Sequence, residues 1–328
     1  MTVDWRQRPE GGGHFAIWLI RSIGTHGGRA LARACLYPIT LYFLLRRGPE
    51  RRASRQWLGR ALGRPATWFD TARHIHCFAA TILDRIFLLS GELDRFDIRV
   101  HGGEALLARL DQGDGMLLFG SHLGSFEALR VLAAQRPGLG LRVVYDRGHN
   151  AAVTHLLDAL NPEVAATAID ARQDGTTILL EVQAALARGQ LVALLVDRAQ
   201  PGEAARVAPF LGHAARFPLA PWQAAAIFGA PVFLGFGLYR GGNRYDLRFE
   251  SFCDGEAVPR SERAAHVAAL IPRYARRLEH YALDAPFNWF NFYDYWDNGT
   301  PATASANGDA GVGGNAGGVP GGASARRA

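Results

Sequence analysis

A histidine and a glutamate five residues apart, His122 and Glu127, are the side chains in this sequence best suited to chemistry. The apolar run Met116–Phe119 and a Gly-Ser turn precede the histidine, which predicts a strand that ends there and a helix that starts from Leu123 onward, with Ser125 as its candidate cap. A carboxylate one helical turn beyond a histidine can orient the imidazole and stabilise its charged form. The free ring nitrogen can then take a proton from an attacking hydroxyl or amine.

The spacing alone does not distinguish this catalytic dyad from a structural histidine and a solvated glutamate. With 11 histidines and 30 acidic residues in 328 positions, chance supplies about one such match. The interpretation therefore depends on the sequence around the pair.

Apolar runs and helical patterns alternate along the middle of the chain. Such alternation predicts an α/β fold, with a mixed, mainly parallel sheet covered by helices. A further run, 244–250, alternates polar and apolar residues and is expected at an edge of the sheet. A helix is expected over 66–95, and another over 261–281, capped by Ser261 and kinked by Pro272. The other expected strands are 116–119, 141–145, 191–196 and 232–236, and the helices between them are 125–135, 151–160, 176–188 and 221–228.

Two further polar side chains follow expected strands, and strand ends face the ligand crevice in open α/β sheets. Arg147 closes one strand, where a surface arginine is common and where its fixed fork of donors would also suit a ligand. Asp197 closes another, where it is either a site residue or a turn former, and Arg198 follows it. The aromatic residues of 289–296 indicate core packing or, alternatively, a lipid-facing surface.

The N-terminal part divides into a Gly-rich stretch, 1–13, and a helical segment, 14–65, that we expect to associate with the membrane. Residues 30–45 carry one charge, Arg33, and are too short for a span of roughly 20 residues. The Arg cluster of 46–55 follows directly. This order predicts an apolar helical anchor lying on an anionic membrane surface. The alternative is a core helix with a solvated basic end.

Composition excludes several classes of protein. All 36 basic residues are arginine, which excludes a Walker-type phosphate loop, a pyridoxal Schiff base and a lysine nucleophile. No G-x-S-x-G elbow occurs. Three scattered cysteines indicate a reducing compartment and no metal site. The net charge of +6 is not accompanied by any nucleic-acid-binding motif, so no nucleic acid partner is expected.

We expect 66–297 to form the catalytic domain and 298–328 a disordered Gly/Ala-rich tail.

Five blocks in order resemble the lipid A late acyltransferases, within the H-x4-D/E acyltransferase superfamily. The block Gly120–Glu127 is similar to the motif that carries the catalytic dyad in that family. The resemblance covers about residues 14–297. Arg198, Leu211 and the segment 291–293 depart from the family pattern, so the acceptor is not assigned to lipid A itself. The other similar blocks are 51–63, 143–150, 194–212 and 286–293.

The resemblance implies acyl transfer from a thioester, on acyl-carrier protein or coenzyme A, to a hydroxyl or amine of a lipid acceptor. His122 would be the general base and Glu127 its partner, with no metal and no organic cofactor. Backbone N–H groups of 120–124 would stabilise the oxyanion. The location implied is the cytoplasmic face of the cell inner membrane. Rival interpretations are a thioesterase or hydrolase using the same dyad, and an inactive membrane-associated scaffold. The substrate-binding residues implied are Ser121, Gly124, Arg147, Asp197 and Arg198.

Overall fold

The computed structural model describes residues 14–130, 138–146, 168–200 and 202–296, with side chains from residue 28 onward except that of Arg130. These residues belong to one compact unit, residues 1–298. Several sequence-based predictions therefore lie outside the described residues: the segments 1–13 and 298–328, the helix 151–160 and the position of Arg147.

A seven-stranded mixed sheet forms the centre of the fold, with strand order β1-β9-β8-β2-β5-β3-β4. All neighbouring strands run parallel except β8 and β9, which are antiparallel. The predicted mainly parallel sheet covered by helices is thereby confirmed. The strands are β1 (Asp97–His101), β2 (Met116–Gly120), β3 (Leu141–Tyr145), β4 (Ile169–Asp170), β5 (Leu191–Leu195), β8 (Val232–Gly241) and β9 (Arg244–Cys253).

The strand β9 shows the predicted alternation of buried and solvent-facing residues, but it is not an edge strand. Strand β1 pairs in parallel with it and takes the edge position. The sequence of β1, Asp-Ile-Arg-Val-His, alternates polar and apolar residues, but it is short and has only two apolar side chains, so it was not predicted as a strand. A separate hairpin of β6 (Ala205–Phe210) and β7 (His213–Pro218) was also not predicted.

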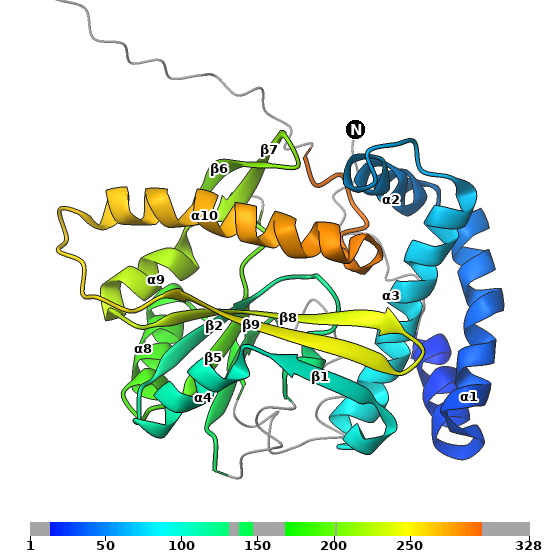
Figure 1. Ribbon diagram of the computed structural model, residues 1–328, viewed down its shortest axis with the longest axis horizontal. Helices are drawn as coiled ribbons and strands as arrows, with labels where there is room; N and C mark the ends of the chain where they lie inside the picture. Colours follow the sequence, from blue (N-terminus) through cyan, green and yellow to red (C-terminus); the bar gives the residue numbers. More distant parts are fainter. Residues whose placement is uncertain (1–13, 131–137, 147–167, 201, 297–328) are drawn as a thin grey trace, which may run out of the picture. The chain divides into compact units, whose positions relative to one another are not determined.

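Two hydrophobic cores lie on opposite faces of the sheet because side chains alternate along each strand. In β2, Leu117 and Phe119 join one core, while Met116 and Leu118 join the other. The first core also contains residues of α2 (Gly48–Ala61), α8 (Gly175–Leu186), α9 (Ala220–Phe228), α10 (Arg263–Asp284) and the β6–β7 hairpin. The second contains residues of α1 (His14–Arg46), α3 (Trp68–Leu89) and α4 (Gly103–Asp111). Figure 1 shows α10 running along one side of the sheet.

Helix α3 begins where its sequence provides a cap. The Thr67 hydroxyl accepts from the Asp70 backbone N–H at 3.1 Å, and the Asp70 carboxylate accepts from the Thr67 N–H at 2.9 Å. This reciprocal capping box satisfies two amides that would otherwise lack partners. Helix α10, by contrast, begins after Glu262 without a side-chain cap, so Ser261 does not have the predicted role. Pro272 lies within α10.

The predicted N-terminal membrane anchor is wrong. No helix in the described part of the chain is both long enough and apolar enough to cross a membrane. Helix α1 instead lies beside α3 (Figure 1), and its Ala32 and Leu36 side chains are buried in the second core. Part of the apolar run of 30–45 therefore contributes to the interior of the protein, while its other large apolar side chains are exposed: Leu31, Tyr37, Leu41, Tyr42 and Leu45.

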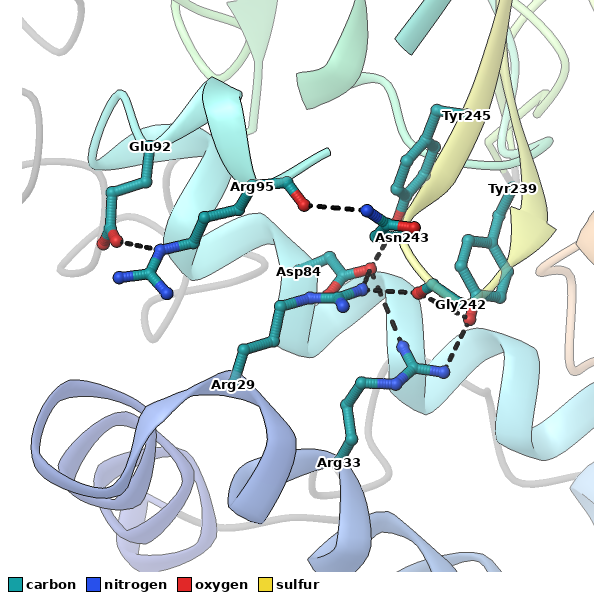
Figure 2. Close-up of polar contacts among 9 residues, drawn as sticks. All are labelled: Arg29, Arg33, Asp84, Glu92, Arg95, Tyr239, Gly242, Asn243 and Tyr245. Atoms are coloured by element: carbon teal, nitrogen blue, oxygen red, sulfur yellow. Dashed lines mark hydrogen bonds and ion pairs between the residues drawn. The ribbon is translucent and has the colours of Figure 1, made fainter. Parts of the chain in front are cut away.

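Buried polar contacts attach α1 to the rest of the fold, as Figure 2 shows. The Arg29 guanidinium donates to both oxygens of the fully buried Asp84 carboxylate on α3, at 2.8 and 2.9 Å. Arg33 donates to the Tyr239 hydroxyl at 2.9 Å, and the Tyr245 hydroxyl donates to Asp84 at 3.0 Å. The Arg cluster of 46–55 also makes a contact within the protein, because Arg51 donates to the backbone carbonyl of Leu44 near the end of α1. A window of sequence cannot reveal that α3 and the β8–β9 hairpin provide partners for these arginines.

Candidate active site

The candidate site lies where two adjacent parallel strands end. Strands β2 and β5 pair in register, with Gly120 opposite Leu195, and the Val196 N–H donates to the Gly120 carbonyl at 3.1 Å. His122 lies two residues after the end of β2, and Asp197 lies two residues after the end of β5. The parallel register therefore brings both side chains to the carboxyl edge of the sheet, where open α/β sheets bind ligands.

The imidazole of His122 contacts the carboxylate of Asp197. The distance between His122 Nδ1 and Asp197 Oδ1 is 2.8 Å. The Asp197 side chain is completely buried, whereas the His122 side chain keeps 29% of its exposure. An ionised carboxylate only accepts hydrogen bonds, so Nδ1 is the donor and the neutral ring has its lone pair on Nε2. Nε2 has no hydrogen-bond partner among the residues that the structure describes.

The surroundings keep this pair in the neutral-base, ionised-acid state. Burial lowers the pKa of His122, and the positive charge of Arg198 lowers it further, against the opposing effect of Asp197. Burial would raise the pKa of Asp197, but the His122 ring and the charge of Arg198 outweigh it, so the pKa lies below its usual value. A neutral imidazole beside an ionised carboxylate is the state required of a general base.

Glu127 has different partners from those that the sequence suggested. Its carboxylate forms an ion pair with Arg85 of α3 at 2.8 Å, and the Ser125 hydroxyl donates to its other oxygen at 3.2 Å. The structure thus brings His122 to Asp197 and brings Glu127 to Arg85. The segment after His122 forms a short 3-10 turn, η3 (Glu127–Arg130), where a helix over 125–135 was expected, and residues 131–137 lie outside the description.

Close backbone contacts determine the shape of this turn. Gly124 has a φ of 76°, and a Cβ on it would lie 2.0 Å from the Gly237 carbonyl oxygen of β8. The N–H of Ser125 donates to that same carbonyl at 2.8 Å. A side chain at position 124 would therefore displace the turn.

The five predicted substrate-binding residues have four different outcomes. Ser121 is buried, with 4% exposure, and its hydroxyl has no hydrogen-bond partner among the described residues. The Gly124 N–H donates to the Asn288 carbonyl at 2.8 Å, so that amide is not available to an oxyanion. Asp197 contacts His122, and Arg198 is adjacent to it. Arg147 lies outside the described residues.

The segment after α10 closes over the site and supplies contacts that the sequence did not predict. The Phe290 N–H donates to the His122 carbonyl at 2.8 Å, and the Tyr295 hydroxyl donates to the Asp197 carbonyl at 2.7 Å. Asn291 donates to the second Asp197 oxygen at 3.3 Å. Trp289, Phe290 and Tyr295 are buried, so core packing is the correct interpretation for these three aromatic residues.

No group of three or more His, Cys, Asp or Glu side chains in the described ranges could hold a metal ion. The site comprises a partly exposed imidazole, a buried carboxylate and the backbone of the strand ends. Together with the fold, it defines an α/β protein with a histidine–carboxylate pair at the carboxyl edge of a mainly parallel sheet.

The family model for bacterial lipid A biosynthesis acyltransferases matches residues 78–296, well over half of the chain. The protein belongs to this family, which confirms the resemblance inferred from the sequence blocks, and it is an acyltransferase. Membership of this family implies an acyl donor and a lipid acceptor, and it suggests a membrane-associated enzyme. No curated protein matches the chain.

Proposed function

We propose that the protein transfers a fatty acyl chain from an acyl thioester to a hydroxyl or amine of a lipid or glycolipid acceptor. His122 acts as the general base, and Asp197 takes the role of orienting carboxylate that the sequence assigned to Glu127. The observation that carries this proposal is the 2.8 Å contact between His122 Nδ1 and buried Asp197, together with the unpartnered Nε2.

The reaction follows from the different roles of the two ring nitrogens of His122. Nε2 accepts the proton of the acceptor hydroxyl or amine while the oxygen or nitrogen attacks the thioester carbonyl carbon. A tetrahedral oxyanion forms, the carbon–sulfur bond breaks, and the thiolate leaves with the proton that His122 returns. Asp197 stabilises the imidazolium that exists between these two transfers without taking its proton.

The arrangement also explains why Glu127 is less suited to this role. Its carboxylate is neutralised by Arg85 and hydrogen bonded by Ser125. We propose that the Arg85–Glu127 pair stabilises the turn that follows His122. A direct catalytic role of Glu127 stays a prediction, and the comparison of variants in the Discussion tests it.

The donor is proposed to be acyl-carrier protein or coenzyme A, because both carry acyl chains as thioesters. The acceptor is proposed to be lipid A or a related lipid, as the family description suggests. A net charge of +6 is compatible with an anionic membrane surface, and we propose the cytoplasmic face of the inner membrane as the location.

The test is transfer of a radiolabelled acyl chain from acyl-carrier protein, or from coenzyme A, to lipid A precursors and to phospholipids. We expect a labelled lipid product with the wild type and a loss of at least 10²-fold with His122→Ala, in the range typical of a lost general base. Near-normal turnover by a folded His122→Ala variant would overturn the proposal. Release of labelled free fatty acid, with no acylated lipid, would show a hydrolase instead.

A further inference from the structure

Behind the Asp197 carboxylate, two residues, Asn291 and Arg198, form a second layer of hydrogen bonds. The Asn291 side-chain amide donates to Asp197 Oδ2 at 3.3 Å, so its carbonyl oxygen points away from that carboxylate. The Arg198 Nε donates to this Asn291 oxygen. One continuous series thus runs from Arg198 through Asn291 and Asp197 to the His122 ring.

The remaining contacts of Arg198 also lie within the protein. Its Nη2 donates to the Phe290 carbonyl at 3.0 Å, and its guanidinium lies over the Tyr293 ring, 5.6 Å from the centroid. The fork of this arginine therefore faces the segment 290–293 and the Asn291 amide. A substrate that used the same donors would have to break these contacts.

We propose that Arg198 and Asn291 are positioning residues for the catalytic pair, and that Arg198 is not the substrate contact that its place in the sequence suggests. Arg198 fixes which way the Asn291 amide faces, and Asn291 in turn holds Asp197 Oδ2, so that Oδ1 points at His122. This inference rests on the proposed function, since it assumes that His122 is the base.

The charges around the pair predict a signature in the pH profile. Three charged groups act on His122: Asp197 raises its pKa, whereas Arg198 and Arg85 of α3 lower it. Around Asp197 the other titratable groups are Tyr274, Tyr293 and Tyr295, whose pKa values burial raises, so they are neutral. Removal of the Arg198 charge should therefore raise the pKa of His122 and move the acid limb of kcat/KM to higher pH.

The experiment compares Arg198→Lys, Arg198→Gln and Asn291→Ala in steady-state acyl transfer over a range of pH. Each variant should lower kcat on the order of 10-fold or more, as is common when an orienting partner is lost, with KM nearly unchanged. Arg198→Gln should also shift the acid limb to higher pH. Arg198→Lys keeps the charge and loses only the planar fork, so its acid limb should stay near that of the wild type.

Arg99→Gln is the matched control, because Arg99 forms an exposed ion pair with Asp97 on β1, at the edge of the sheet. Its kcat, KM and pH profile should equal those of the wild type. A rise in KM with unchanged kcat in both Arg198 variants would make Arg198 a substrate contact and overturn the inference. An acid limb that does not move in Arg198→Gln, at full folding by circular dichroism, would also overturn it.

The proposed function is tested separately in the same assay by His122→Ala. If that variant loses activity but the Arg198 and Asn291 variants retain wild-type kcat, only the positioning role is wrong. If His122→Ala retains activity, the general-base proposal itself fails.

Discussion

The two ring nitrogens of His122 lie in different surroundings, and this difference determines what the residue can do. Nδ1 contacts a fully buried carboxylate, while the ring as a whole keeps 29% of its exposure. The buried side fixes the tautomer, and Nε2 remains available to a substrate. The carboxylate in this arrangement comes from position 197, 75 residues away in the chain, and not from the adjacent motif.

The first prediction compares the two carboxylates. Asp197→Asn should lower kcat/KM by about 10²–10⁴-fold, because an amide can present a donor to Nδ1 and favour the wrong tautomer. Glu127→Gln should lose less, because the Glu127 carboxylate binds Arg85 and not the imidazole. Steady-state acyl transfer by both variants is the measurement. A larger loss for Glu127→Gln than for Asp197→Asn would restore the dyad predicted from the sequence.

A second prediction concerns the pH dependence of the wild type. The base must be neutral to accept a proton, and burial together with Arg198 lowers the pKa of His122. The acid limb of kcat/KM should therefore lie below pH 6.5, the ordinary value for histidine. The profile is measured with free enzyme and subsaturating substrate. An acid limb above pH 6.5 would mean that Asp197 dominates the electrostatics of the ring.

At the scale of secondary-structure elements, the helices α2 and α3 hold the segment that closes the site. The His74 ring on α3 lies between the Ser54 hydroxyl, 2.8 Å from Nδ1, and the Trp289 carbonyl, 2.7 Å from Nε2. Because the carbonyl only accepts, Nε2 carries the proton and Nδ1 accepts from Ser54. The Trp57 indole of α2 donates to the Pro286 carbonyl at 2.7 Å. Both contacts position the backbone that reaches His122.

The third prediction follows from the burial of His74, which lowers its pKa to about 4. The unfolded chain, with a pKa near 6.5, binds a proton in a range where the folded protein does not. Stability should therefore decrease as the pH falls from about 6.5 towards 4, by up to about 3 kcal/mol at 1.36 kcal/mol per pKa unit. Urea unfolding at pH 7 and pH 5 measures this dependence.

The His74→Gln variant should lose most of that pH dependence, although it is less stable at pH 7. His101→Gln, at an exposed position on β1, is the control and should retain the wild-type dependence. Equal pH dependence in all three proteins would show that the pKa of His74 does not differ between the folded and unfolded states.

At the scale of the whole molecule, the Asp84 network joins α1, α3 and the β8–β9 hairpin. Asp84 accepts from Arg29 and Tyr245, and Arg33 reaches Tyr239 (Figure 2). Removing one member of a buried pair leaves the other without compensation, which is strongly destabilising. Since α1 and α3 both carry residues of the second core, this network influences the stability of the entire fold.

The fourth prediction is a double-mutant cycle on that pair. Arg29→Met should lower the free energy of unfolding by up to about 3–5 kcal/mol, because Asp84 is completely buried. The double variant Arg29→Met/Asp84→Leu should lose less than the sum of the single variants, because it leaves no unpaired carboxylate. Arg99→Met, at an exposed ion pair, should cost about 0–1 kcal/mol. Additive losses in the cycle would indicate that α1 is not coupled to α3 through this contact.

The sequence by itself determined the elements whose patterns are local. The apolar runs of β2, β3, β5 and β8 are long enough to specify strands, and the family blocks around His122 identified the class of enzyme. Strand β1 was not predicted because its polar–apolar alternation contains only two apolar residues, and the β6–β7 hairpin was not predicted because its strands lack a continuous apolar run. Local pattern also gave His122, Asp197 and Arg198 as candidates, though not their partners.

Tertiary structure alone decided which side chains meet. The parallel register of β2 and β5 places Asp197 against His122, and Arg85 of α3 pairs with Glu127. The segment 288–296 supplies Asn291 and Tyr295 only because α10 returns it across the strand ends. In the same way, the partners of Arg29 and Arg33 of α1, and the second core that buries its Ala32 and Leu36, come from α3 and β8–β9, which lie far from α1 in the chain. Such contacts depend on sheet register and helix packing, which hydrophobic periodicity does not encode.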